Sequence, residues 1–402
     1  MRGNHKRKNW FYLVLSLIIT TAVSVGYNPK DIAAQSVGKP LKIGVAAPLS
    51  GPAVPWGNAT LRPMLLYADE VNAKGGVMAA GEKHRIEVIY YDHKYRADEA
   101  ATAVRRLIMR DKCDYLAVLG GGVMPAVAGM IQDNPVICFA VAFGLGVLDP
   151  KFDHVFVALS QPVELAYVWK WFAENRPGIK RVAMVAVNDN VGRMSGTMVE
   201  RRTEEFGLTC VGVEYYERDI TDFTAALSRL LAKKPDIIDF DGSPAGTTAL
   251  ILKQARELGF KGDVIHGGHT DPEVIIKMVG PEKAEGFYTS DALPAGFEWY
   301  KRKYVERFGE WDNMGPAFGR YGPIVVQAIK KADSLDPRKV LKVLESPDFT
   351  WDELFGGKGR FYGKDEPLYR ISHQGLVPEY LGQVRNGKFE YVTKYGSPLL
   401  PK

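Results

Sequence analysis

The sequence predicts an α/β protein built as two doubly wound lobes, each around a parallel sheet. Short apolar, β-rich runs alternate with segments of helical period, and this alternation occurs in two separate blocks. Strongly twisted sheets rarely have more than about ten strands, so a single sheet made of all the predicted strands would be unusual. No Pro/Ser-rich tract or low-complexity segment separates the blocks. We therefore expect two lobes joined by short crossing strands, which favours hinge motion over independent tumbling.

The individual elements follow from the periodicity of apolar residues. The first block has predicted strands at 41–47, 85–91, 114–119 and 135–141, with helices at 59–73, 97–110 and 124–131. The second block has predicted strands at 181–187, 208–216, 236–240 and 263–267, with helices at 191–206, 221–232 and 245–258. After residue 292 the pattern is richer in helix, at 294–308 and 322–332, and ends in strands rich in glycine and aromatic residues.

Composition excludes several classes of protein. A chain of 402 residues with 46% apolar and 25% charged residues has enough apolar residues for real cores, unlike a disordered chain. Four of its basic residues lie within the first eight positions, and without them 48 Lys and Arg stand against 47 Asp and Glu. Because positive and negative charges are nearly equal in number, we predict that the protein has no nucleic-acid partner. The three cysteines, Cys113, Cys138 and Cys210, are expected to be buried thiols, with a Cys113–Cys138 bridge as the alternative.

Residues 1–34 have the profile of a signal peptide. The basic start is followed by sixteen uncharged residues, Trp10 to Val25, fewer than the roughly 20 that span a bilayer. Small residues suit cleavage after Gly26 or Ala34, and neither site is followed by a cysteine that a lipid could anchor. We expect an exported periplasmic or extracellular protein that is not a lipoprotein. An uncleaved anchor is the alternative, and it would leave the same domain outside the membrane.

The catalytic motifs of common exported enzymes are missing from the sequence. It contains no G-x-S-x-G, no H-E-x-x-H and no phosphate-binding P-loop motif. Asp189 and Asp241 follow predicted strands, where they could act as acid and base or simply cap the next helix. His266, His269 and Asp271 share one loop and could be read as metal ligands. We predict no enzyme, no cofactor and no metal site.

Several short motifs, in order, resemble the leucine/isoleucine/valine-binding protein family. They are KIGVAAPLSGP at 42–52, Trp56-Gly57, NAKGG at 72–76, QARELGF at 254–260 and Tyr321-Gly322. This family comprises type I periplasmic substrate-binding proteins of ATP-driven (ABC) importers, and the resemblance extends from residue 41 to about 385. It implies two lobes joined by a hinge of three crossings, with a ligand between them. The implied first lobe is 40–159 with 291–371, and the second is 160–290 with 372–402.

The loops that follow parallel strands are where such folds bind ligands, because helix N-termini there offer unpaired N–H groups. In the first lobe Trp56 matches the family's aromatic lid, although a core tryptophan is the alternative. Gly121, Gly122 and Val123 stand where amino-acid binders place hydroxyl groups for a carboxylate. Their backbone N–H groups could receive an anion instead, or the glycines could simply make a tight turn. The next loop is also apolar, and its predicted ligand contacts are Ala142 and Phe143.

The second lobe departs from the family pattern as well. Asn190 and Val191 match a loop that usually supplies a tyrosine, and Ser243 falls near another aromatic position. The acidic partner of a ligand ammonium would fall around Gly268, next to the predicted contacts His269, Thr270 and Asp271. These departures favour an aromatic or aliphatic carboxylate, with His269 or Arg193 assisting the backbone. An inward-turned Asp271 would keep amino acids and amides as ligands.

The sequence therefore predicts an extracytoplasmic solute-binding protein. It would capture a small molecule by closure of two lobes and deliver it to an ABC permease at the membrane. One alternative is a ligand-sensing partner of a membrane signalling protein, and a less favoured one is an exported enzyme that uses Asp189, Asp241 or the histidine loop.

Overall fold

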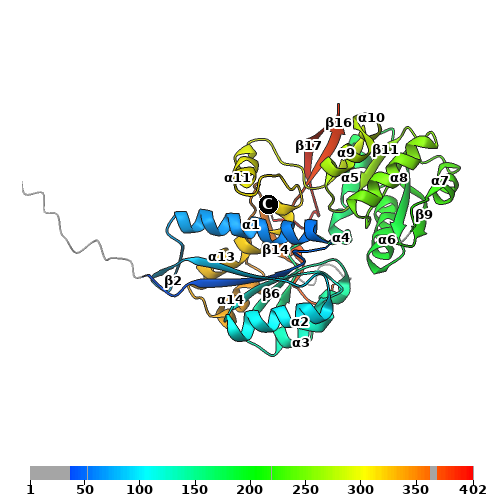
Figure 1. The fold of residues 1–402 in the computed structure, drawn as a ribbon. Coiled ribbons are helices and arrows are strands. Elements are labelled where there is room, and N and C mark those ends of the chain that lie inside the picture. Colours follow the sequence, from blue (N-terminus) through cyan, green and yellow to red (C-terminus); the bar gives the residue numbers. More distant parts are fainter. Residues whose placement is uncertain (1–36, 52, 219, 363–368, 402) are drawn as a thin grey trace, which may run out of the picture.

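The computed structural model describes residues 37–401, apart from residues 52, 219 and 363–368, and it has two lobes (Figure 1). The predicted signal peptide, with its two cleavage sites, lies outside the described residues. The predicted α/β class with parallel sheets is confirmed, since a five-stranded and a seven-stranded sheet form the centres of the two lobes. We call the lobe with the five-stranded sheet the first lobe and the other the second lobe.

The sheet of the first lobe is parallel throughout, as expected for strands joined by helices. Its spatial order is β4 (Ile86–Asp92), β1 (Leu41–Ala47), β5 (Tyr115–Leu119), β6 (Ile137–Val141) and β7 (Val155–Phe156). All residues of β5 and β6 are buried because helices cover both faces of the sheet. Figure 1 shows α1 on one side and α2 and α3 on the other. These helices are α1 (Val54–Ala73), α2 (Ala97–Arg105) with the π-helical turn η1 (Arg106–Arg110), and α3 (Met124–Gln132), followed by the 3-10 turn η2 (Leu145–Val147).

The sheet of the second lobe has five parallel strands and a C-terminal antiparallel hairpin. Its order is β17 (Lys388–Tyr395), β16 (Glu379–Arg385), β12 (Phe287–Thr289), β11 (Asp263–His266), β10 (Ile237–Asp239), β8 (Arg181–Val187) and β9 (Thr209–Tyr216). The helices of this lobe are α4 (Pro162–Leu165), α5 (Val168–Asn175), α6 (Asn190–Glu205), α7 (Thr224–Leu231), α8 (Ala245–Glu257), α9 (Pro272–Val279) and α10 (Pro281–Ala284).

Further elements pack on the first lobe. Helices α11 and α12 contact α1, and α13 contacts α1, α14 and β13. The additional helices are α11 (Glu298–Phe308), α12 (Gly315–Phe318), α13 (Tyr321–Ala332) and α14 (Pro337–Leu344). The small sheets are the hairpin β2 (Val77–Ala79) with β3 (Glu82–His84), and the antiparallel sheet of β13 (Thr350–Asp352), β14 (Lys358–Phe361) and β15 (Gly375–Leu376).

The chain passes between the lobes in three segments: from β7 to α4, from β12 to α11, and from β15 to β16. These crossings lie side by side. The backbone N–H of Ala292 in the second crossing donates to the carbonyl of Tyr380 just after the third, at 2.9 Å. Ser160 in the first crossing bonds to Glu379 in the third. Short, mutually bonded crossings form a hinge rather than a tether, while the lobe boundaries at residues 159, 290 and 371 stay a prediction.

The three cysteines are free thiols, and the alternative Cys113–Cys138 bridge is not formed, but the prediction that all three are buried is wrong for Cys210. Cys113 and Cys138 are buried in the first-lobe core, and Cys210 is half-buried on β9. Burial raises the pKa of the Cys113 thiol to about 12, so this group is protonated and unreactive at neutral pH. Within the described part of the chain, no helix has both the length and the apolar character needed to span a membrane.

Candidate functional site

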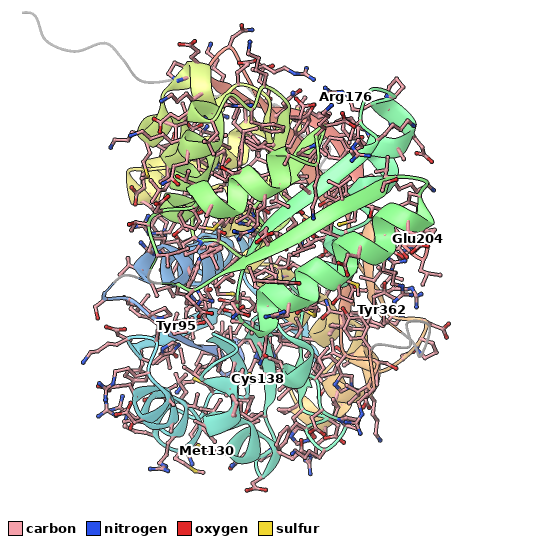
Figure 2. The ribbon with its side chains drawn as sticks, turned by 90° about the vertical axis from the view of Figure 1, so that its right-hand side faces the viewer. Tyr95, Met130, Cys138, Arg176, Glu204 and Tyr362 are labelled. Atoms are coloured by element: carbon pink, nitrogen blue, oxygen red, sulfur yellow. The ribbon has the colours of Figure 1, made fainter. Side chains whose placement is uncertain are left out.

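Loops at the carboxyl ends of the two parallel sheets meet between the lobes. Phe143, just after β6, stacks on the imidazole of His269, just after β11, with 6.0 Å between ring centroids and 28° between planes. Figure 2 places Tyr95, from the loop after β4, where the first lobe borders the second. The structure thus brings together loops of both lobes that were predicted to line a cleft.

An aromatic pair forms one corner of the first-lobe surface. Trp56 in the first turn of α1 lies 6.1 Å, centroid to centroid, from Tyr95. Tyr95 has a left-handed backbone (φ 59°), and its N–H donates to Nδ1 of His93 at 3.0 Å. Nε2 of His93 therefore carries the ring proton and donates to the carbonyl of Leu119, and burial lowers the pKa of this histidine. A Cβ on Gly120 would lie 3.0 Å from the Tyr95 ring, so glycine at 120 lets the ring rest on the turn.

The glycine turn after β5 offers backbone donors. Within the described residues, no acceptor is found for the N–H of Gly121 or of Gly122. A Cβ on Gly121 would lie 2.7 Å from the carbonyl oxygen of Phe143, so the two loops approach too closely for any other residue there. Val123 and Ala142 are buried behind the turn. Two adjacent unpaired N–H groups on a glycine turn can receive an anion.

On the second lobe, Asp189 caps helix α6. Its Oδ1 accepts the N–H groups of Val191 and Gly192 at 3.0 Å, and its other oxygen pairs with Arg218. Of the two interpretations of Asp189, acid or cap, the contacts match the cap. Asn190 and Val191 form the first turn of α6, where Asn190 is exposed and Val191 half-buried.

Asp241 supplies a buried carboxylate beside Gly268. Its Oδ2 accepts a hydrogen bond from the Ser195 hydroxyl at 2.6 Å, and its Oδ1 accepts the N–H of Gly242. A Cβ on Gly268 would lie 2.3 Å from Asp241 Oδ1. The carboxylate therefore fills the space that a side chain at 268 would enter. The acidic group missing from position 268 is present at almost the same place, carried by the neighbouring strand end.

A second carboxyl group, Asp239, lies beneath the first. Its Oδ1 accepts the N–H groups of Asp241 and Gly267 at 2.9 and 3.0 Å. Burial, and then the charge of Asp241, raise the pKa of Asp239 to about 8. Asp239 is therefore mostly protonated at neutral pH.

His266 faces Asp241 with an unpaired nitrogen. Its Nε2 donates to the carbonyl of Ser243 at 2.9 Å, so in the neutral ring Nδ1 is an acceptor. Nδ1 is buried, has no hydrogen-bond partner among the described residues and lies 3.9 Å from Asp241 Oδ1. Two acceptors that face each other can be bridged by a ligand N–H or O–H group. The Ser243 hydroxyl bonds instead to the Tyr216 hydroxyl at 2.7 Å, which places an aromatic residue beside Ser243.

The loop after β11 continues with two further predicted contacts. The Thr270 hydroxyl is buried and has no hydrogen-bond partner within the described chain. Asp271 accepts the N–H of Glu273 at 3.0 Å and so caps α9, while burial raises its pKa. The three residues read as possible metal ligands therefore have different surroundings: Asp271 caps a helix, His266 faces Asp241, and His269 pairs with Asp291.

His269 is enclosed between the two lobes, next to the second crossing. Its Nδ1 contacts both oxygens of Asp291 at 2.8 and 2.9 Å. The imidazole stacks on Phe143 and meets the ring of Phe318 edge-on at 5.9 Å. Burial opposes charge on the ring, but the Asp291 carboxylate outweighs it and raises the pKa of His269.

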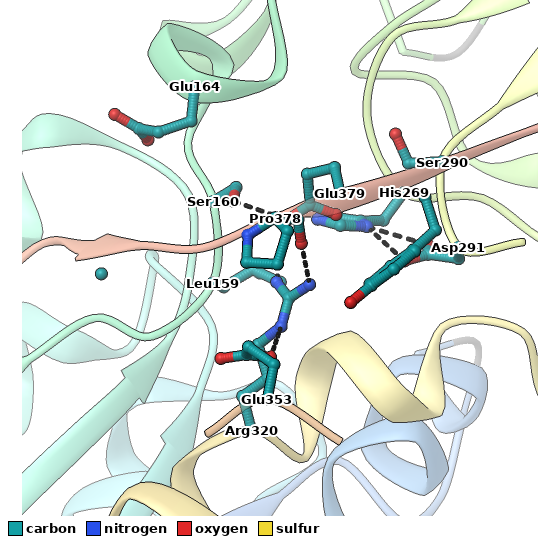
Figure 3. Close-up of polar contacts among 12 residues, drawn as sticks. Leu159, Ser160, Glu164, His269, Ser290, Asp291, Arg320, Glu353, Pro378 and Glu379 are labelled. Atoms are coloured by element: carbon teal, nitrogen blue, oxygen red, sulfur yellow. Dashed lines mark hydrogen bonds and ion pairs between the residues drawn. The ribbon is translucent and has the colours of Figure 1, made fainter. Parts of the chain in front are cut away.

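A buried ion network continues from this pair through the crossings (Figure 3). Glu379, at the start of β16, accepts hydrogen bonds at Oε1 from the Ser160 hydroxyl (2.6 Å) and from the Arg320 guanidinium (2.8 Å). Arg320 also pairs with Glu353 at 3.2 Å. All of these side chains are at least nine-tenths buried. The network therefore ties the first and third crossings to the first lobe.

Comparison with known proteins identifies the family. A family model described as periplasmic binding protein matches residues 40–388. The chain belongs to the periplasmic binding protein family. This periplasmic binding protein is 22% identical over 370 residues to the leucine-, isoleucine-, valine-, threonine-, and alanine-binding protein of Pseudomonas aeruginosa, covering 88% of this chain and 95% of the relative. The predicted resemblance is thus confirmed.

Two solved structures illustrate the shared fold of this periplasmic binding protein. A branched-chain amino acid transporter substrate binding protein from Streptococcus pneumoniae, in complex with isoleucine, has 20% identity and a TM-score of 0.69, covering 89% of this chain and 99% of that one. A solute binding protein of an ABC transporter from Rhodopseudomonas palustris, in complex with 3,4-dihydroxy benzoic acid, has 21% identity and a TM-score of 0.69, covering 89% and 97%. The family is one of extracytoplasmic binding proteins.

The sequence did not predict that some residues of this periplasmic binding protein lie at the candidate site between the lobes. Tyr95 was omitted because the loop after β4 was not counted among the cleft loops, although its place at a strand's carboxyl end was a usable signal. Asp241 was considered as an acid or base or as a helix cap, and His266 as a metal ligand or catalytic group, but neither was predicted to contact a ligand. Ser195 and Tyr216 carry no signal in the sequence, since their contacts depend on the packing of α6 and β9 against the loop after β10.

Proposed function

We propose that this periplasmic binding protein is the extracytoplasmic solute receptor of an ABC importer. Closure of its lobes would enclose a small carboxylate or amino-acid-like molecule and present it to a permease at the membrane. The observation that carries the proposal is the complementarity of the two faces. The first lobe offers the free N–H groups of Gly121 and Gly122, and the second offers Asp241.

The polarity of the two faces indicates which chemical groups the ligand carries. An anionic end would bind the glycine turn, and a donor end, either an ammonium or a hydroxyl group, would bind between Asp241 and His266. Trp56 and Phe143 would pack on the body of the ligand. The predicted contacts Asn190, Val191, Ser243, His269 and Thr270 remain part of the proposal. Because Asp241 is present, α-amino acids are as well accommodated as the carboxylates that the sequence favoured.

We expect no catalysis at this site, despite its Ser, His and Asp residues. A nucleophilic serine needs a general base, such as a histidine or a lysine, to take its proton. Here Ser195 donates its proton to Asp241, and Nε2 of His266 is used by the Ser243 carbonyl. We also expect that export removes a signal peptide within residues 1–34, which the mass of the exported protein would test.

The proposal is tested by thermal shift and calorimetry with isoleucine, threonine, benzoate, 3,4-dihydroxybenzoate and isovalerate. A ligand present at a hundred times its dissociation constant stabilises the protein by about 2.7 kcal/mol, which such a scan resolves. Asp241→Asn should weaken ligands with an ammonium or hydroxyl donor at least tenfold and leave plain carboxylates nearly unchanged. Asp153→Asn, on the outer surface, is the matched control. The proposal fails if no compound of these classes binds the wild-type protein.

A further inference from the structure

His269, Asp291 and Glu379 form a buried cluster at the hinge whose side chains could hold a cation. A nitrogen of His269 and one oxygen each of Asp291 and Glu379 lie within 4.8 Å of one another, and all three residues are buried. They come from three different segments: the loop after β11, the second crossing and the third crossing. We propose that this cluster binds a divalent transition-metal ion next to the proposed solute site, with which it shares His269.

Two buried atoms of the cluster lack a partner. Nε2 of His269 and Oε2 of Glu379 make no hydrogen bond within the described residues. In Figure 3 the Glu379 carboxylate lies beside the end of the imidazole that is turned away from Asp291. A buried polar atom without a partner is costly, and an ion between these two atoms would satisfy both.

The surrounding contacts match the outer shell of a metal site. A histidine that binds a metal with one nitrogen usually gives its other N–H to a carboxylate, as His269 Nδ1 does to Asp291. The far oxygen of Glu379 is held by Ser160 and Arg320, which orients Oε2 toward the imidazole. Asp291 would therefore position the histidine.

The buried side chains of the network include more carboxylates than cationic groups, which favours a bound cation. Three buried carboxylates, those of Asp291, Glu353 and Glu379, face one guanidinium, that of Arg320. A divalent ion bound to His269 would offset this excess of negative charge. Imidazole and carboxylate ligands suit Zn²⁺ or Mn²⁺. In a tetrahedral site with bond lengths of about 2.0–2.2 Å, ligand atoms stand about 3.4 Å apart, so binding would draw atoms that now lie within 4.8 Å of one another closer by up to about 1.4 Å.

The experiment uses the full exported chain, purified without a histidine tag and treated with EDTA. We expect calorimetry and elemental analysis to find one equivalent of Zn²⁺ or Mn²⁺ and thermal scans to show a higher Tm with the ion. Co²⁺ should give a visible absorption band that reports coordination directly. A wild-type protein that binds none of these ions stoichiometrically would overturn the proposal, and a proton on His269 would then balance the cluster.

Variants assign the bound ion to the cluster. His269→Gln and Glu379→Gln should abolish the Co²⁺ band, and Asp291→Asn, a positioning residue, should weaken binding about 10- to 100-fold. The matched control is His373→Gln, because His373 is also buried and faces a glutamate, Glu345, at 3.5 Å, away from the cluster. Circular dichroism identifies the variants that fold. An unchanged Co²⁺ band in a folded Glu379→Gln or His269→Gln protein would refute the site.

Discussion

The ring of Phe143 and the imidazole of His269 stack across the boundary between the lobes, 6.0 Å apart. Phe143 follows β6 of the first lobe and His269 follows β11 of the second. Phe318, in a helix that packs on the first lobe, closes the other side of the imidazole. The second-lobe histidine thus contacts two first-lobe rings, and a movement that separates the lobes at this point would break both contacts.

Phe143→Ala should therefore weaken solute binding by destabilising the closed form. An aromatic pair contributes about 0.5–1.5 kcal/mol beyond its buried area, which corresponds to a two- to tenfold loss of affinity. Calorimetry measures the affinity, and small-angle scattering should show a larger radius of gyration for the variant without ligand. Tyr90→Ala, on the half-exposed strand β4, is the control and should leave both unchanged. Equal affinities for Phe143→Ala and wild type would contradict this account.

Gly268→Ala should destabilise the protein because its Cβ would lie 2.3 Å from Asp241 Oδ1. The carboxylate would have to move away from Ser195, so we expect a loss of about 1–3 kcal/mol, typical of overpacking, and weaker solute binding. Denaturant unfolding measures the first effect. Gly129→Ala in α3 is the matched control, since its Cβ would meet nothing within 4 Å and alanine favours a helix. A Gly268→Ala protein as stable as Gly129→Ala would show that Asp241 lies elsewhere.

The strands that the sequence predicts best are those buried on both faces. Strands β1 and β8 begin and end where they were predicted, at 41–47 and 181–187, because a central parallel strand reads as one continuous apolar run. Helix α1 begins at Val54 rather than at residue 59, since Pro55 fits a first helical turn, where its missing N–H costs nothing. The hairpin of β2 and β3 was not predicted, because three-residue strands show too little periodicity.

The contacts between the lobes were predictable in outline and not in detail. The sequence places loops at the carboxyl ends of strands, and this was enough to locate Phe143 and His269. It does not show that Asp241 fills the space beside Gly268, because that depends on how neighbouring strands pair: Asp239 is level with Ile265 in β11. Nor does it show that Tyr95 adopts a left-handed backbone, since tyrosine has no preference for that region.

Asp239→Asn should change how stability depends on pH. The pKa of Asp239 is about 8 in the folded chain, above its ordinary value of 3.8, because burial and then the charge of Asp241 favour the protonated form. The folded chain thus keeps a proton on Asp239 that the unfolded chain loses. The contribution of this proton to the free energy of unfolding is complete below about pH 4 and is lost as the pH rises toward 8. The slope is at most about 1.4 kcal/mol per pH unit.

Asparagine at 239 stays neutral, so the stability of Asp239→Asn relative to wild type should improve steadily from pH 5 to pH 8. Denaturant unfolding at several pH values measures this difference. Asp133→Asn, at an exposed position, should give a curve parallel to that of wild type. A constant difference between Asp239→Asn and wild type across this range would mean that Asp239 is ionised throughout.

Arg320→Met should be among the most destabilising single changes in the chain. Arg320 is buried and pairs with Glu379 and Glu353, and methionine would leave two buried carboxylates without their cation. Removing one partner of such a network costs about 3–5 kcal/mol. The surface pair of Arg338 with Asp336 provides the control, because Arg338 is exposed and solvent screens the pair. Thermal unfolding should therefore show a large drop in Tm for Arg320→Met and none for Arg338→Met. Similar Tm values for the two variants would mean that the hinge network does not stabilise the fold, and that the crossings are held by packing alone.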